Sequence, residues 1–294
     1  METAAAQQYN PTVIERPSRP RAESREVVEL KLLKAAQPEL ASAVDMQLAL
    51  VDMQRRVQSR VPLPWLQADD AWLKSQQAAG RSLIRFSDIP LDWSDFRLTF
   101  RQTADILLRF DALEPSDHQS IVTIAREGHT LEPLVAQWYA ATSGAGDPAP
   151  QDAPAGLDQV LVLALRPFLM RCTEVLKQRV DLSSWSRAHC PFCGWEPDFA
   201  VITQNGDRQL ICGRCSAQWP FAAFACPFCG NDDRARVTSF TSRDGRYRVY
   251  GCQACHRYLK AYDARNATRS VMVAVDSIAT LPLDAAAIQR GYLG

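Results

Sequence analysis

Apolar residues between positions 26 and 180 recur at steps of three and four, the spacing of the buried face of an amphipathic helix. From about Glu26 this period predicts two helices that are split near Pro38, because proline has no amide donor for a helix interior. The same period predicts helices at 69–77, 93–111, 116–127, 131–141 and 157–180. Candidate N-cap residues precede or open the first four of these: Asp69, Ser94, Ser116 and Thr130.

Two segments lack the helical period. Residues 1–25 mix proline, glutamine and arginine without an apolar face, which predicts a mobile N-terminal arm. Residues 143–156, SGAGDPAPQDAPAG, predict an exposed loop. The helix after this loop most simply packs back on the earlier helices as part of the same bundle. The sequence therefore predicts one all-α helical domain at 26–180, interrupted by that loop.

Beyond Asp181 the pattern changes to short β-type runs. The turn dipeptides Asn205-Gly206 and Asp244-Gly245 join these runs into hairpins. We expect one hairpin unit at 181–220 and another at 221–269. The remaining residues, 270–294, predict a tail that packs on the body as a strand or a helix.

Eight of the nine cysteines form four C-x-x-C pairs between Cys190 and Cys255. The motif CPFCG occurs at 190–194 and again at 226–230, and each copy is followed by a hairpin and a second pair. The chain is therefore internally duplicated with a shift of about 36 residues. A C-x-x-C turn places two sulfurs on one side of a loop, and a hairpin brings a second such turn opposite it. The expected fold class is thus α+β, with an N-terminal helical domain followed by two tandem zinc-ribbon metal modules.

Each half of the duplication supplies one predicted set of four ligands. Pairing within each half gives Cys190, Cys193, Cys212 and Cys215 for site 1, and Cys226, Cys229, Cys252 and Cys255 for site 2. Interleaved pairing is the alternative. Four thiolates suit either zinc or iron, with zinc the default for a structural site. We therefore expect two metal ions per chain.

The residues within the turns have their own conformational roles. Proline after the first cysteine of each CPFCG motif fixes φ, and the closing glycine takes the left-handed conformation that points backbone amides at sulfur. Ser216 and His256 stand where the second turns would be expected to carry glycine, which leaves the geometry of those turns open.

Other residues near the cysteines have simpler interpretations. Cys172 lies in an apolar helical run and is expected to be a buried thiol. His189 and His256 adjoin the turns, but four cysteines already complete each set. Three aromatic residues between the halves are expected to join the ribbons or dock them on the helices, with a partner-binding patch as the alternative. They are Trp219, Phe221 and Phe224.

Charge and hydropathy exclude several function classes. The 33 basic and 33 acidic residues cancel, and the formal charge of +4 between Asp181 and Ser270 is neutralised when two divalent ions bind eight thiolates. A basic nucleic-acid groove is therefore not expected. No apolar stretch has the length of a membrane span or the form of a secretory signal, which predicts a cytoplasmic protein without membrane insertion.

No phosphate loop, nucleophile elbow or zinc-hydrolase helix occurs, so no catalytic residue is predicted and the chain is not expected to be an enzyme. The residues leave two alternatives open, a nucleic-acid-binding zinc-ribbon protein and a thiol or iron redox protein. Four pairs in hairpins do not match the single pair beside a βαβ unit that thioredoxin-like catalysis uses.

The chain resembles the FdhE family of formate dehydrogenase accessory proteins. The resemblance is specific over 190–292 and general in the helical half. It rests on the four C-x-x-C units, on Trp219 four residues after Cys215, on the run Tyr258, Leu259 and Lys260, and on the closing VDSIATLPLDAAAIQRGY.

The resemblance implies a chaperone-like maturation factor needed for the assembly of active respiratory formate dehydrogenase. It implies that the chain binds the catalytic, molybdenum-containing subunit of that enzyme in the cytoplasm. It also implies rubredoxin-like metal turns, which favours iron over zinc. The oligomeric state is left open.

Overall fold

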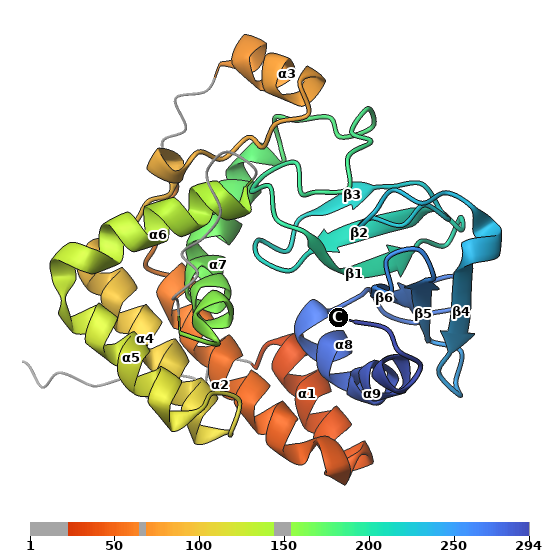
Figure 1. Cartoon of the computed structure of the whole chain (residues 1–294), viewed down its shortest axis with the longest axis horizontal. Helices are drawn as coiled ribbons and strands as arrows, with labels where there is room; N and C mark the ends of the chain where they lie inside the picture. The colour runs from red at the N-terminus through yellow and green to blue at the C-terminus, as the bar shows by residue number, and fades with distance from the viewer. Residues whose placement is uncertain (1–22, 65–68, 144–153, 294) are drawn as a thin grey trace, which may run out of the picture.

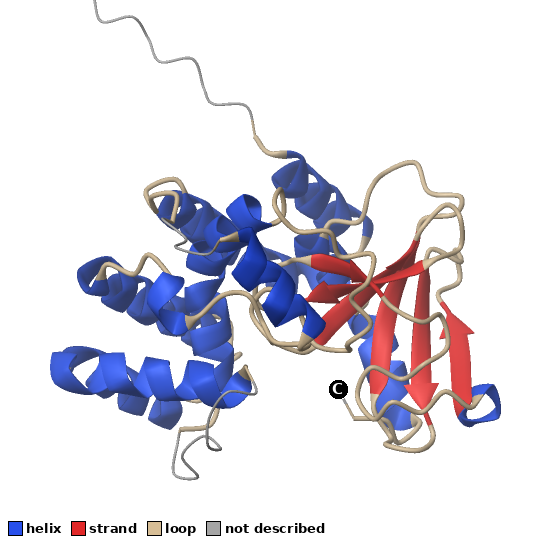
Figure 2. Ribbon diagram, turned by 90° about the horizontal axis from the view of Figure 1, so that it is seen from above, coloured by secondary structure: helices blue, strands red, loops and turns tan. Residues whose placement is uncertain are grey.

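The computed structural model describes residues 23–64, 69–143 and 154–293. Nearly all of the expected N-terminal arm and most of the expected loop at 143–156 lie outside the described residues. Helices gather on one side of the molecule and a β-sheet on the other, as Figure 1 and Figure 2 show. This arrangement confirms the α+β class.

The helical half follows the apolar period closely. A 3₁₀ turn at Pro38–Leu40 separates the first two helices, which confirms the predicted split. The helices are α1 (Arg25–Ala36), α2 (Ala41–Gln58), α3 (Asp70–Ala78), α4 (Trp93–Arg109), α5 (Pro115–Arg126), α6 (Gly128–Thr142) and α7 (Leu157–Leu176). None of the helices in the parts of the chain that the structure describes has the length and apolar character needed to cross a membrane.

The N-cap predictions are right for one helix in four. The Asp69 carboxylate accepts a hydrogen bond at 2.6 Å from a backbone amide in the first turn of α3, which confirms it as an N-cap. Ser94 was the wrong choice, because Asp92 two residues earlier caps α4. Ser116 and Thr130 were also wrong, because they lie inside the first turns of helices that begin earlier. At α5 a proline in the first turn sets φ without a side-chain cap.

The two cysteine-rich halves form one six-stranded sheet in the order β3-β2-β1-β6-β5-β4. Each half contributes three antiparallel strands, and β1 and β6 join the halves as a parallel pair in which Val201 lies opposite Tyr262. The ribbons are therefore tandem in sequence and continuous in the sheet. The strands are β1 (Pro197–Ile202), β2 (Arg208–Cys212), β3 (Gln218–Pro220), β4 (Val237–Thr241), β5 (Tyr247–Cys252) and β6 (Tyr258–Asp263).

The C-terminal tail forms two helices, α8 (Val273–Ala279) and α9 (Leu281–Gln289). Figure 1 shows both helices beside the sheet, with α8 next to α1. The carboxylate of Asp276 on α8 is fully buried and accepts hydrogen bonds from Arg269 and from the Tyr247 hydroxyl on β5. The tail therefore connects the sheet to the first helices.

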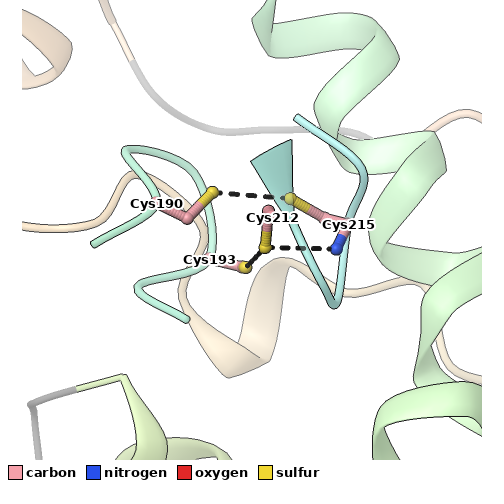
Figure 3. Close-up of side chains that lie close together, drawn as sticks. All are labelled: Cys190, Cys193, Cys212 and Cys215. Carbon is pink, nitrogen blue, oxygen red and sulfur yellow. Dashed lines mark hydrogen bonds between the residues drawn. The ribbon is translucent and has the colours of Figure 1, made fainter. Parts of the chain in front are cut away.

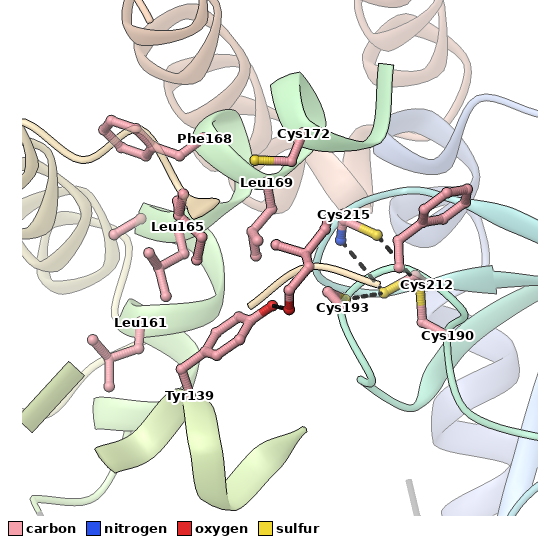
Figure 4. Close-up of a cluster of buried hydrophobic side chains, with 14 of the residues drawn as sticks. Tyr139, Leu161, Leu165, Phe168, Leu169, Cys172, Cys190, Cys193, Cys212 and Cys215 are labelled. Atoms are coloured by element: carbon pink, nitrogen blue, oxygen red, sulfur yellow. Dashed lines mark hydrogen bonds between the residues drawn. The ribbon is translucent and has the colours of Figure 1, made fainter. Parts of the chain in front are cut away.

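The largest hydrophobic cluster passes from the helices into the first cysteine half without a break. It joins Leu165 and Phe168 of α7 to Cys193 and Trp219 (Figure 4 shows the part around α7). Site 1 therefore lies in the same core as the helices, and the domain boundary near Asp181 stays a prediction.

Candidate metal centres

Site 1 forms where two tight turns meet at one end of the first ribbon. Cys190 and Cys193 lie in the turn before β1, Cys212 ends β2 and Cys215 follows it. The antiparallel register sets Pro197 of β1 opposite Cys212, which brings the two turns together. Figure 3 shows the four side chains converging. The Sγ atoms of Cys190 and Cys215 are 3.5 Å apart, and those of Cys193 and Cys212 are 3.4 Å apart.

Site 2 repeats this arrangement in the second ribbon. The Sγ atoms of Cys226 and Cys255, and those of Cys229 and Cys252, are 3.7 Å apart. The register of β4 and β5 sets Val237 opposite Cys252. The structure thus brings the cysteines together within each half of the duplication, without interleaving.

The sulfur geometry fits a tetrahedral ion. Within each group the ligand atoms all lie within 4.8 Å of one another. A tetrahedral ion with metal–sulfur bonds of about 2.3 Å would hold its sulfurs about 3.8 Å apart. Each of the two groups could therefore hold one metal ion, and a set of four thiolates accepts zinc and iron equally.

The turns share one backbone conformation, including the two that lack glycine. Gly194 and Gly230 have φ of 76° and 75°, as the CPFCG motif predicts. Ser216 and His256 have φ of 58° and 57°, so they take the same left-handed conformation at the matching positions. In each turn the amide of this residue donates to the carbonyl of the turn's first cysteine, at 2.9–3.1 Å. The geometry that the sequence left open is therefore the same in all four turns.

The surroundings of site 1 are buried and contain a cation. Arg214, inside the second turn, is fully buried, and its guanidinium donates to the Cys193 carbonyl at 2.8 Å and the Thr142 hydroxyl at 2.9 Å. Burial opposes this charge, but Cys193, Tyr139 and Cys212 together outweigh it, so the pKa of Arg214 is raised. Three rings surround the guanidinium with centroids 4.6–5.1 Å away: Trp138, Tyr139 and Trp195.

The same network favours an ionised sulfur. Burial opposes ionisation of Cys193, but hydrogen bonds from the other three thiols and the charge of Arg214 outweigh it, so its pKa lies well below that of a free thiol. A filled tetrathiolate site with a divalent ion carries a charge of −2, so a buried cation beside it lowers the cost of burying that charge. The role of Arg214 was not predicted from the sequence. The one difference that could have indicated it is that the equivalent position in the second half is Ala254.

The other predicted residues lie where the sequence placed them. Cys172 is fully buried on α7, its sulfur 3.8 Å from the Asp88 carbonyl, and burial raises its pKa to about 12. It is confirmed as a buried thiol. Among the described residues the two candidate metal groups contain only cysteine. The His189 ring nitrogen instead lies 3.1 Å from the Gly80 carbonyl, and His256 is exposed.

The aromatic residues between the ribbons divide into two kinds. Trp219 is buried and its indole donates to the Arg187 carbonyl at 3.1 Å, and Phe221 packs on the same core cluster. These two confirm the expected packing role. Phe224 is 43% exposed, and the guanidinium of Arg234 lies 3.7 Å from its ring centroid.

The fold and the two groups define a helical protein carrying a pair of four-cysteine ribbon centres. No family model matches the chain. Curated relatives do match: the FdhE homolog of Shewanella baltica is 28% identical over 145 residues, and that of Shewanella sp. MR-4 is 32% identical over 145 residues. Each match covers 48% of this chain and 48% of the relative, so the matched region spans about half the length of these relatives.

A solved structure extends the likeness to nearly the whole chain. The crystal structure of the FdhE protein from Pseudomonas aeruginosa covers 92% of this chain and 91% of its own, with a TM-score of 0.61 and 22% identity, which shows that the fold is shared. The chain is therefore similar to FdhE proteins in sequence over about half its length, and it shares the fold of one of them over nearly all of it.

Proposed function

We propose that this chain is an accessory factor for the assembly of active respiratory formate dehydrogenase. The observation that carries the proposal is the pair of four-cysteine groups, held in a fold shared with a solved FdhE protein over 92% of the chain. The similarity to FdhE proteins provides the link to formate dehydrogenase.

In this proposal the metal ions have a structural part. The eight cysteines hold one ion per site, and each ion cross-links two turns of one ribbon. Because site formation is coupled to folding, the ions stabilise the sheet against the helices. Iron is the metal that the family resemblance favours, with zinc as the alternative. Arg214 balances the charge of site 1, and no residue is assigned to bond making or breaking.

The proposed partner is the catalytic subunit of formate dehydrogenase, bound in the cytoplasm. A chaperone-like role needs a recognition surface and no turnover. The sheet, tied to the loop after α7 by Trp219 and to α8 by the Asp276 network, supplies a support for such a surface.

Formate-dependent dye reduction tests the proposal. A strain lacking the gene should lose this activity while the dehydrogenase subunits remain detectable, and the wild-type gene should restore it. The exposed-turn variant Arg243→Met is the control and should restore it equally, since Arg243 lies outside both cysteine groups. Unchanged activity in the deletion strain would refute the maturation role.

A further inference from the structure

The two cysteine groups share a geometry and differ in their access to solvent. In site 1 every cysteine is at most 2% exposed. In site 2 Cys226 and Cys252 are buried, but Cys255 is half-buried and Cys229 is exposed. Because each C-x-x-C turn of one half has a counterpart in the other half, the cause can be found turn by turn.

The first turns of the two sites differ in how closely other parts of the protein cover them. Phe192 is 1% exposed in the first CPFCG motif, whereas Phe228 is half-buried in the second. A Cβ atom on Gly194 would lie 2.9 Å from the backbone of Ser143 at the end of α6, while one on Gly230 would meet nothing within 4 Å. Figure 4 shows site 1 beside α7 and Tyr139. The helices therefore cover site 1 and leave site 2 open.

The second turns of the two sites differ in whether they contain a cation that balances the charge of the filled site. Site 1 has the buried guanidinium of Arg214, held by the Cys193 carbonyl and ringed by aromatic side chains. At the matching position site 2 has Ala254, which is exposed. The charge of a filled site 1 is thus balanced by a guanidinium within its own turn, whereas the cations near site 2, Arg208 and Arg257, lie outside its turns.

We propose that site 2 is an exchangeable metal site, and that site 1 keeps its ion for as long as the core stays folded. The ligand is a borderline-soft divalent ion, zinc or ferrous iron, which passes between the cysteines and external thiol or chelating donors at the exposed Cys229 sulfur. This inference rests on the proposal above that both groups hold metal.

Access to sulfur is what separates the two sites. An incoming donor or proton has to reach a metal–sulfur bond before the ion can leave. At site 2 it reaches Cys229 in the native state, whereas at site 1 the shared core must first open. Opening a hydrophobic core costs a free energy close to that of unfolding the whole protein. The two release rates should therefore differ at least about a thousandfold.

The test uses the full-length chain loaded with zinc and an excess of the colorimetric chelator 4-(2-pyridylazo)resorcinol. One ion per chain should leave in a fast phase and one in a slow phase. After the fast phase, N-ethylmaleimide and peptide mapping should find label on Cys226, Cys229, Cys252 and Cys255 and none on the cysteines of site 1.

Two variants sharpen the test. Cys229→Ser should abolish the fast phase and leave one slowly released ion. Cys172→Ala, which changes a buried cysteine outside both groups, should keep both phases. If Cys229→Ser does not fold, the labelling of the wild-type chain decides the question.

The failures are distinguishable. Fewer than two ions in the loaded wild-type chain would overturn the ligand assignment and this inference with it. Two ions that leave within tenfold of each other, or early label on the site 1 cysteines, would overturn the inference alone.

Discussion

Replacing Arg214 by methionine should destabilise the protein far more than a surface arginine would. Methionine keeps much of the side-chain length and removes the charge. The change leaves the Cys193 carbonyl and the Thr142 hydroxyl without their guanidinium donor in a buried site. It also removes the cation from the centre of three rings.

The magnitude follows from these contacts. Hydrogen bonds to a charged group contribute about 1.5–3 kcal/mol each, and a cation over aromatic rings adds roughly 0.5–2 kcal/mol. The substitution also removes the energetic cost of burying the charge of Arg214, which offsets part of this loss. We expect the free energy of unfolding to fall by about 3 kcal/mol, within the range for breaking a buried ionic contact. At this chain length that lowers Tm by roughly 5 °C.

Urea unfolding of the metal-loaded protein, followed by tryptophan fluorescence, measures the loss. Arg243→Met, in the exposed turn between β4 and β5, is the matched control and should change the free energy of unfolding by at most about 0.5 kcal/mol. If Arg214→Met cost no more than this control, the buried guanidinium would not stabilise site 1 and the reasoning would be refuted.

Three further variants test the turns and the buried thiol. Gly194→Ala should lower the free energy of unfolding by at least about 1 kcal/mol more than Gly230→Ala does. Both residues have positive φ, but only a Cβ at position 194 would meet the Ser143 backbone. Equal losses of unfolding free energy would contradict this. His256→Gly should stabilise the chain by about 0.5 kcal/mol. Glycine avoids the strain of the left-handed conformation, and this gain exceeds the cost of the greater chain entropy in the unfolded state. A lowered Tm would count against it. The raised pKa of Cys172 keeps its thiol neutral in the folded state, so its contribution to stability is complete below about pH 9 and is lost as pH rises toward 12. Cys172→Ala should therefore show a smaller fall in urea midpoint between pH 8.5 and about 10 than the wild type, and parallel curves would refute the assignment.

The helices and the two cysteine groups could be predicted because their signals are local. The three- and four-residue period marks each buried helical face, and Pro38 marks the break between α1 and α2. The spacing of each C-x-x-C pair, with one hairpin between the pairs, determines which sulfurs can meet. That logic places Cys190 with Cys215 and Cys226 with Cys255, as the structure does.

Contacts between distant segments have no such local signal. The parallel pairing of Val201 with Tyr262 depends on how two separate hairpins meet, which neither hairpin encodes alone. The burial of site 1 depends on α6 and α7, so two identical CPFCG motifs end in different surroundings. Arg214 was missed because an arginine inside a turn usually faces solvent, and only the tertiary fold encloses it.

The central claim is that the eight paired cysteines hold two metal ions per chain. Metal analysis of the purified native protein, compared with Cys226→Ser and with a variant in which Cys190 is also serine, tests it most directly. The account predicts two, one and no ions per chain respectively. Two ions retained in either variant, or a wild-type chain without metal whose pairs are oxidised to disulfides, would contradict it.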